Sequence, residues 1–220
     1  MTHYYRGLLT LDEPDPDGRT EVPVEQIGKG MFSRAYTTKT GTPYVYLITQ
    51  EEDEGDYSKR ALEEFNRDDS SPYIPKVVDV GCLDNGACVY RMPVYHAPLR
   101  KSDSARAWKQ YRALRRCWED AEDIVRRDLQ HRHGFVRAWH HQYIHSGHRI
   151  MDEVIECAQK SKAVPNGLVR ALEELRDALS NYGADYSFEF SPRNLATTEG
   201  GHLILLDVTF SLESVARKRR

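Results

Sequence analysis

Three oxygen-bearing side chains near the end of this 220-residue chain have types and spacing suited to chemistry on a metal-bound phosphate. Asn194 follows Glu189 by five positions, and Asp207 follows Asn194 by thirteen. The apolar run Leu203–Leu206 ends directly at Asp207, and a carboxylate there requires a partner or a metal. An amide oxygen and a carboxylate on the two arms of a short hairpin can share Mg²⁺ that also bridges nucleotide phosphates. The alternative is that Asp207 only caps a turn and that Asn194 only ends a loop.

A glycine-rich segment lies far earlier in the chain, between two expected strands. Its residues are Gly28, Lys29, Gly30, Met31, Phe32 and Ser33. Glycines allow backbone N–H groups to approach a phosphate closely. Because a strand follows rather than a helix, the segment is neither a Rossmann nor a P-loop site. A simple hairpin with glycines at its tip is the competing interpretation.

Strands dominate the part of the chain that must position the glycine-rich segment. Short apolar or alternating runs separated by turn signals predict strands and one helix, at about 57–66. The expected strands are Val22–Ile27, Ser33–Thr37, Tyr44–Thr49, Lys76–Cys82 and Cys88–Met92. Asn85-Gly86 favours a tight turn joining the last two.

Helices dominate the second half. Helical spacing predicts one helix from a cap at Ser102 or Asp103 to about Gln130, and a second over 135–160 with a potential break at Ser146-Gly147. A third follows Pro165-Asn166 and stops at Gly183. Two short strands, Asn194–Thr197 and His202–Leu206, then form a hairpin. The layout is α+β, with a β-rich lobe over 1–93, a helical lobe over 94–220 and a ligand cleft expected at the joint, where Met92 and Val94 lie.

Composition limits the partners. The net charge of −3 argues against a strongly basic nucleic-acid binder, and no apolar stretch approaches the roughly 18 residues of a membrane span. Four cysteines without C-x-x-C spacing predict reduced thiols in a cytoplasmic protein.

In these segments the chain resembles the protein kinase superfamily, and within it the early protein kinases of T-odd bacteriophages and the small kinase effectors of pathogenic bacteria. The matching stretches are Gly28–Tyr36, Ile74–Val80 and Ser187–Phe210. The resemblance implies a two-lobed minimal kinase fold with a reduced second lobe. It also implies ATP and Mg²⁺ as cofactors, and phosphoryl transfer to serine or threonine of a host or partner protein. Glu189 would then be the base, with Asn194 and Asp207 on Mg²⁺.

Three departures from the kinase pattern keep a second function open. Leu47 stands where the phosphate-contacting lysine is expected, for which Lys29 or Lys39 could substitute, and Glu189 replaces an aspartate. Only thirteen residues follow Asp207, too few for an ordinary activation loop and substrate platform. We favour an active kinase over a pseudokinase that binds and inhibits a host or regulatory protein. Phosphorylation of a small molecule is the remoter third alternative.

Two further clusters have structural alternatives. Six histidines from His131 to His148 include a His141/His145 pair at metal-ligand spacing, but we favour ordinary helix packing as their explanation. A basic stripe that includes Lys109, Arg112 and Arg116 is either a solvated helix face or a surface for nucleic acid or an acidic protein. Trp108 and Tyr111 are expected on another face.

Overall fold

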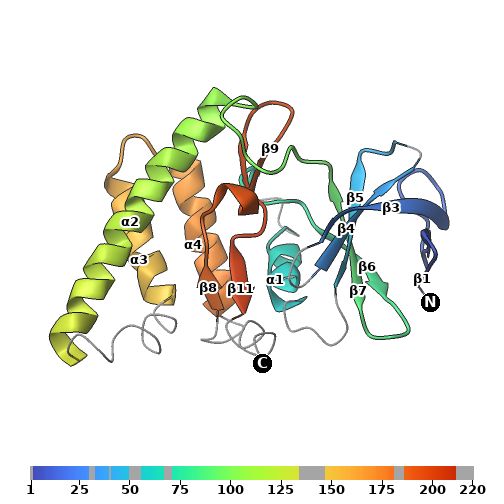
Figure 1. Ribbon diagram of the computed structural model, residues 1–220, viewed down its shortest axis with the longest axis horizontal. Helices are drawn as coiled ribbons and strands as arrows, with labels where there is room; N and C mark the ends of the chain where they lie inside the picture. The colour runs from blue at the N-terminus through green and yellow to red at the C-terminus, as the bar shows by residue number, and fades with distance from the viewer. Residues whose placement is uncertain are drawn as a thin grey trace. The chain divides into compact units, whose positions relative to one another are not determined.

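The computed structural model describes residues 2–29, 33–39, 41–49, 56–66, 71–133, 147–180 and 186–211. The chain forms a mixed α+β structure, as predicted, and divides into two compact units. The first unit contains residues 1–66 and 76–94, and the second contains residues 67–75 and 95–220 (Figure 1). Among the described residues, none of the helices combines the length and the apolar composition needed to cross a membrane.

The first unit is a curled antiparallel sheet of seven strands with one helix. The strand order is β1-β2-β3-β4-β5-β7-β6. The strands are β1 (His3–Tyr5), β2 (Leu8–Thr10), β3 (Glu21–Lys29), β4 (Ser33–Thr38), β5 (Tyr44–Thr49), β6 (Val78–Cys82) and β7 (Cys88–Pro93), and the helix is α1 (Asp56–Asn66). Thr2 bridges to Leu83, so the first strand reaches the turn that follows the last strand in the sheet order.

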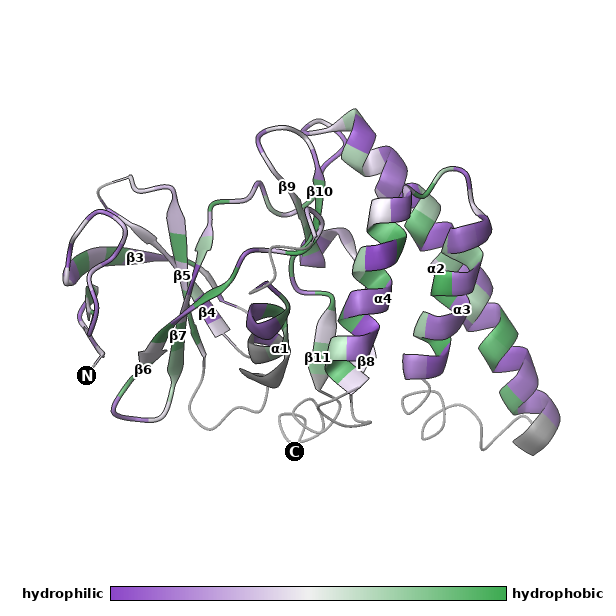
Figure 2. Ribbon diagram, turned by 180° about the vertical axis from the view of Figure 1, so that it is seen from behind, coloured by the Kyte–Doolittle hydropathy of each residue, from purple (hydrophilic) through white to green (hydrophobic). Residues whose placement is uncertain are grey.

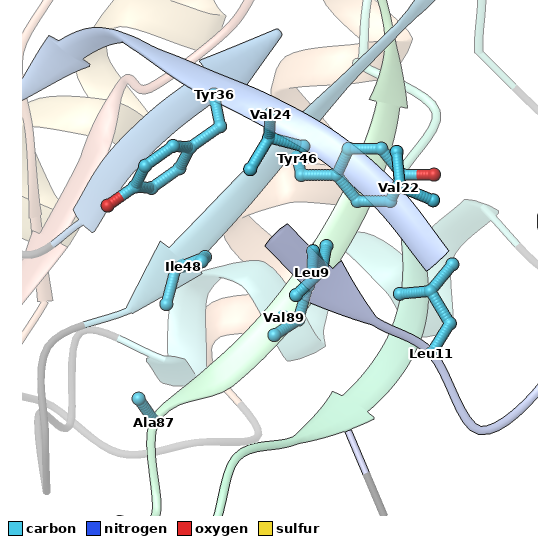
Figure 3. Close-up of a cluster of buried hydrophobic side chains, with 9 residues drawn as sticks. All are labelled: Leu9, Leu11, Val22, Val24, Tyr36, Tyr46, Ile48, Ala87 and Val89. Carbon is cyan, nitrogen blue, oxygen red and sulfur yellow. The ribbon is translucent and has the colours of Figure 1, made fainter. Parts of the chain in front are cut away.

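Alternation of side chains explains why this sheet curls around a core. Along β3, Val22 and Val24 are buried, and the intervening residues are more exposed. Tyr36 of β4 and Tyr46 of β5 are directly paired, so they lie on the same face and meet these valines. Figure 3 shows their side chains gathered with Leu9 and other apolar residues inside the curl. The strands β1 and β2 were not predicted because three-residue strands carry almost no alternation signal.

The prediction of four reduced thiols is wrong for one pair. Cys82 and Cys88 are directly paired across β6 and β7, and the structure joins them in a disulfide. Their side chains lie opposite each other because the turn around Asn85-Gly86 brings the two strands into register, as the sequence predicted. Cys117 and Cys157 are free thiols, and burial and the neighbouring Cys157 raise the pKa of Cys117 to about 12.

Three helices form the core of the second unit. They are α2 (Ala105–His133), α3 (Gly147–Lys160) and α4 (Asn166–Ser180), and α3 packs against both α2 and α4 (Figure 1). Each helix mixes hydrophilic and hydrophobic residues along its length (Figure 2). The buried face of α4 consists mainly of the leucines at helical spacing that the sequence predicted, Leu168, Leu172, Leu175 and Leu179. The predicted helical stretch from 135 to 146 lies outside the described residues.

The cap of α2 differs from the prediction of Ser102 or Asp103. Ser104 caps the helix, since its Oγ accepts a hydrogen bond from the N–H of Ala107 at 3.1 Å. The same hydroxyl donates to the carbonyl oxygen of Gly201 at 2.8 Å. Ser104 is therefore selected by two contacts, and the contact to Gly201 could not be read from the local sequence.

Two small antiparallel pairs complete the second unit. The first pair is β9 (Leu195–Thr197) with β10 (Leu203–Leu205), which agrees with the predicted hairpin. The second pair is β8 (Tyr186–Phe188) with β11 (Thr209–Ser211), which was not predicted. Because β8 precedes the first pair and β11 follows it, the two pairs are consecutive parts of one long hairpin.

We predict that reducing the Cys82–Cys88 disulfide lowers the free energy of unfolding by about 2 kcal/mol, because it frees a short loop in the unfolded chain. The two residues are separated by six positions. Urea unfolding with and without a phosphine reductant measures the difference. In a Cys82→Ala/Cys88→Ala variant the reductant should have no effect, which separates this disulfide from the thiols of Cys117 and Cys157. Equal stability of wild type in both conditions would contradict the prediction.

Candidate functional site

Asn194 and Asp207 are joined through their backbones. The carbonyl oxygen of Asn194 accepts hydrogen bonds from the N–H groups of Leu206 and Asp207, each at 3.0 Å. Asn194 ends a short 3-10 turn, Pro192–Asn194, directly before β9, and Asp207 follows β10 by two residues. The hairpin register therefore brings together two residues that are thirteen positions apart.

Glu189 belongs to the same pair of chain segments. Its N–H donates to the carbonyl oxygen of Val208 at 2.8 Å. The segment from Glu189 to Asn194 connects β8 to β9, and the segment from Leu206 to Val208 connects β10 to β11. These two segments, here called the paired connectors, are hydrogen-bonded at both ends. All three residues predicted to be catalytic thus lie on the paired connectors.

The side chain of Asn194 has a defined orientation. Its Nδ2 lies 3.5 Å from the carbonyl oxygen of Glu189, which can only accept a hydrogen bond. The amide nitrogen therefore faces that carbonyl, and the Oδ1 oxygen faces away from it. An amide oxygen held in this way, on a residue whose backbone is bonded to that of Asp207, is a suitable donor for a hard cation such as Mg²⁺.

The charges at the connectors come from three side chains. Asp207 is exposed and Glu189 is partly exposed. Arg193 places its guanidinium 3.6 Å from Oε1 of Glu189, one helical turn further along the chain. The side chain of Arg193 is 83% exposed, so this ion pair contributes little to stability.

An aromatic contact anchors the first connector to the helices. Phe190 is completely buried, and its ring meets that of Trp118 on α2 edge-on at 5.2 Å between centroids. Leu99 adds two hydrogen bonds, from its N–H to the carbonyl oxygens of Pro192 and Leu195. The backbone of the first connector is consequently fixed by packing, while the side chain of Glu189 stays partly exposed.

The described side chains supply only part of the ligands that a metal ion needs. Within the described ranges, no three His, Cys, Asp or Glu side chains lie close enough together to hold a metal ion. A cation at Asn194 and Asp207 would complete its coordination shell with phosphate or water oxygens, which is the usual arrangement for Mg²⁺ at a nucleotide. The residues present fit that role.

The predicted glycine-rich segment begins in the first unit at a β-bulge. The pairing of β3 with β4 shifts between Gln26 and Gly28, which leaves Ile27 as the extra residue. An extra residue moves every later side chain to the other face of the sheet. Gly28 therefore pairs with Ala35 and lies on the face opposite Tyr36 and the core. Gly30, Met31 and Phe32 lie outside the described residues.

A row of small and apolar residues crosses the sheet from Gly28. Direct pairing places Ala35 opposite Gly28, Leu47 opposite Ala35, and Tyr90 opposite Leu47. All four positions are on one face, because directly paired residues share a face. Among the described residues, a methyl group added at Gly28 would meet only the Cβ of Ala35, at 3.7 Å, so these neighbours do not require glycine there.

The other predicted nucleotide-binding residues of this unit lie on nearby strands. Ser33 begins β4 and pairs with Thr49, and Lys29 pairs with Arg34. Met92 is buried on β7, whereas Val94 is 48% exposed and its N–H donates to the carbonyl oxygen of Pro43.

Sequence reasoning missed one lysine of the first unit. Lys59 on α1 is only 8% exposed, although lysine is almost never buried without interactions, and it does interact with a neighbour. Its position three residues before buried Leu62 is the signal that could have identified it. Leu47, in contrast, is partly buried at the position where a lysine was expected, and Lys39 is exposed.

The remaining two clusters are only partly described. Of the histidines, His140, His141 and His145 lie outside the described residues, and His148 packs edge-on against Phe188 at 6.0 Å. On α2, Trp108 and Tyr111 have ring centroids 5.2 Å apart and line a surface hollow together with Arg112, Arg115 and Arg116. The expectation that these aromatics point away from the basic face is therefore wrong.

Comparison with known proteins adds no family to this description. No protein-family model matches the chain, and a search of curated proteins finds no match.

Proposed function

We propose that this chain is a minimal protein-kinase-like enzyme that transfers the γ-phosphoryl group of ATP to serine or threonine of a partner protein. The observation that carries the proposal is the backbone pairing of Asn194 with Asp207, on connectors that also hold Glu189. In kinases, the proton acceptor and the Asn metal ligand likewise lie on a loop, and the Asp metal ligand lies at the end of a neighbouring strand. The β-bulge that turns Gly28 away from the core adds support, because bulges often lie next to active sites.

Each residue has a separate task in this proposal. The Oδ1 of Asn194 and the carboxylate of Asp207 would hold Mg²⁺, whose charge offsets that of the phosphates. Backbone N–H groups of the segment Gly28–Ser33 would donate to phosphate oxygens. The two units would act as the two lobes of a kinase, so that both act on one nucleotide.

Glu189 would take part in the transfer itself. The acceptor hydroxyl oxygen forms a bond to the γ-phosphorus, the bond from that phosphorus to the bridging oxygen breaks, and ADP leaves. Glu189 accepts the proton of the hydroxyl group. Arg193, 3.6 Å from the Glu189 carboxylate, would act as a positioning residue that holds the longer side chain in place of the usual aspartate.

A second candidate function rests on Leu47. Its place on β5, in the row that begins at Gly28, puts an apolar side chain where kinases have the lysine that contacts phosphates. A pseudokinase that binds a host or regulatory protein would retain the fold and tolerate this change. The two candidates differ in whether phosphate is transferred, and both allow nucleotide binding.

We predict that Mg²⁺-ATP raises the unfolding temperature of the wild type, and that Gly28→Ala and Asp207→Asn each reduce this gain. A ligand at 100 times its Kd stabilises the folded state by about 2.7 kcal/mol. Without ligand, Gly28→Ala should unfold at or slightly above the wild-type temperature, because its methyl group makes only an ordinary contact.

Asp177→Asn, on the exposed face of α4, is the matched control for Asp207→Asn and should keep the full response. The two test variants lie in different units of the chain. A response lost in one variant and retained in the other would contradict a nucleotide shared by both units.

We predict that Glu189→Gln lowers phosphoryl transfer by about 10²-fold or more while the response to Mg²⁺-ATP is retained, because only the proton acceptor is removed. Transfer is measured with radiolabelled ATP, as autophosphorylation and as labelling of lysate proteins. Glu189→Asp, which keeps a carboxylate, should retain more activity than Glu189→Gln. Nucleotide binding without any transfer by the wild type would establish the pseudokinase instead.

A further inference from the structure

The first unit contains a cavity that the proposed nucleotide site does not use. Its volume is about 370 Å³, within the range of small-molecule sites. Its walls come from β1, β4, β5 and the turn between β6 and β7, and include Tyr4, Arg34, Tyr36, Ile48, Thr49 and Asn85. Tyr36, Ile48 and Ala87 belong to both the cavity and the core, and Figure 3 shows these three at one end of the core cluster. The cavity therefore adjoins one end of the core of the curled sheet.

The cavity and the glycine row lie on opposite faces of β4. Arg34 and Tyr36 line the cavity, whereas Ala35, between them, pairs with Gly28. Successive side chains of a strand point to opposite faces of its sheet. A ligand in the cavity would therefore be separated by the sheet from a nucleotide held at Gly28.

The described lining residues of the cavity carry a positive charge. Arg34 is the one ionised side chain among the described lining residues. Asp84 lies on the turn between β6 and β7, beside the lining residues Leu83 and Asn85. Its carboxylate is paired with Nδ1 of His3 at 2.8 Å. Arg34 is an exposed side chain that lines the cavity, and its charge lowers the pKa of Tyr4, against the larger effect of burial, which raises that pKa. A cation among described lining residues that include no carboxylate favours an anionic ligand.

The rest of the lining favours an aromatic ring. The rings of Tyr4 and Tyr36 lie 5.1 Å apart at 56°, and their side chains are joined by a hydrogen bond. Together with Ile48 they form an apolar wall next to Arg34. Tyrosine rings provide large contact areas for planar ligands at a low cost in side-chain entropy.

Hydrogen bonds and a disulfide fix the wall that is formed by Thr49 and the turn between β6 and β7. The Oγ1 of Thr49 accepts a hydrogen bond from the N–H of Cys88 at 2.7 Å and donates to its carbonyl oxygen at 3.3 Å. The disulfide of Cys82 and Cys88 closes the turn that contributes Leu83, Asn85 and Ala87. A preformed wall removes part of the ordering cost of binding.

We propose that this cavity binds a small aromatic anion, a single ring that carries a carboxylate or a phosphate monoester. Arg34 contacts the anionic group, and Tyr4 and Tyr36 contact the ring. The proposal does not depend on the proposed kinase activity.

Isothermal titration of the full chain with phenyl phosphate and with benzoate tests the proposal. We expect a Kd of about 1 mM or tighter for at least one of them, and weaker binding of neutral benzyl alcohol and of inorganic phosphate. Whichever anion binds more tightly identifies the anionic group. Arg34→Gln should weaken binding of that probe by about tenfold or more, since it removes a charge-assisted hydrogen bond.

Two control variants make the experiment specific. Arg19→Gln removes another arginine of the same unit that does not line the cavity, and it should bind the probe as the wild type does. Gly28→Ala should also leave binding unchanged, which separates this cavity from the nucleotide site. Tyr4→Ala should weaken binding of the aromatic anion and leave the weak binding of inorganic phosphate as it is. Unfolding temperatures of all variants establish that each is folded.

Three results would overturn the proposal. The first is that neither anion binds with a Kd of about 1 mM or tighter. The second is that a folded Arg34→Gln variant binds the probe as tightly as the wild type. The third is that benzyl alcohol or inorganic phosphate binds as tightly as the aromatic anions, because the cavity would then not recognise a charged ring.

Discussion

The hydrogen bonds between the paired connectors are the constraint on which the candidate site depends. The carbonyl oxygen of Asn194 receives two backbone N–H groups, and Val208 receives the N–H of Glu189. Backbone bonds of this kind hold residues at fixed spacing whatever their side chains are, so the connectors form a frame on which side-chain chemistry can vary. A change of side-chain length at Glu189 is tolerable on such a frame, because it leaves the backbone bonds of Asn194 and Asp207 unaltered.

The parts of this structure that sequence predicted well are those with a repeated signal. The leucines of α4 recur at helical spacing, and β3, β4, β5 and β7 have apolar alternation, so their existence and approximate limits were correct. The hairpin of β9 and β10 was found because two glycines interrupt two apolar runs. Local patterns were sufficient wherever one element buries one face.

The parts that were missed depend on contacts between distant residues. Ser104 caps α2 because Gly201 accepts its hydroxyl, and Cys82 meets Cys88 because the strands are in register. The face of the sheet on which Gly28 lies depends on a bulge at Ile27, and the amino-acid composition of the strand does not indicate this bulge. At the candidate site, sequence spacing named the three residues, but only the structure shows that they share one pair of segments and that Arg193 reaches Glu189.

The bond from Ser104 to Gly201 has a consequence for local motion. One hydroxyl caps the first turn of α2 and also holds the turn between β9 and β10. A Cβ added to Gly201 would lie 2.9 Å from this hydroxyl oxygen, and the positive φ of Gly201 also favours glycine. Opening the hairpin turn breaks the bond to Gly201, and opening the first turn of α2 breaks the bond from Ala107. Because both openings involve the Ser104 hydroxyl, we expect the amides of the two turns to exchange together. The Ser104 hydroxyl in this way links the start of α2 to the hairpin that carries Asn194 and Asp207, although Ser104 lies on neither β9 nor β10.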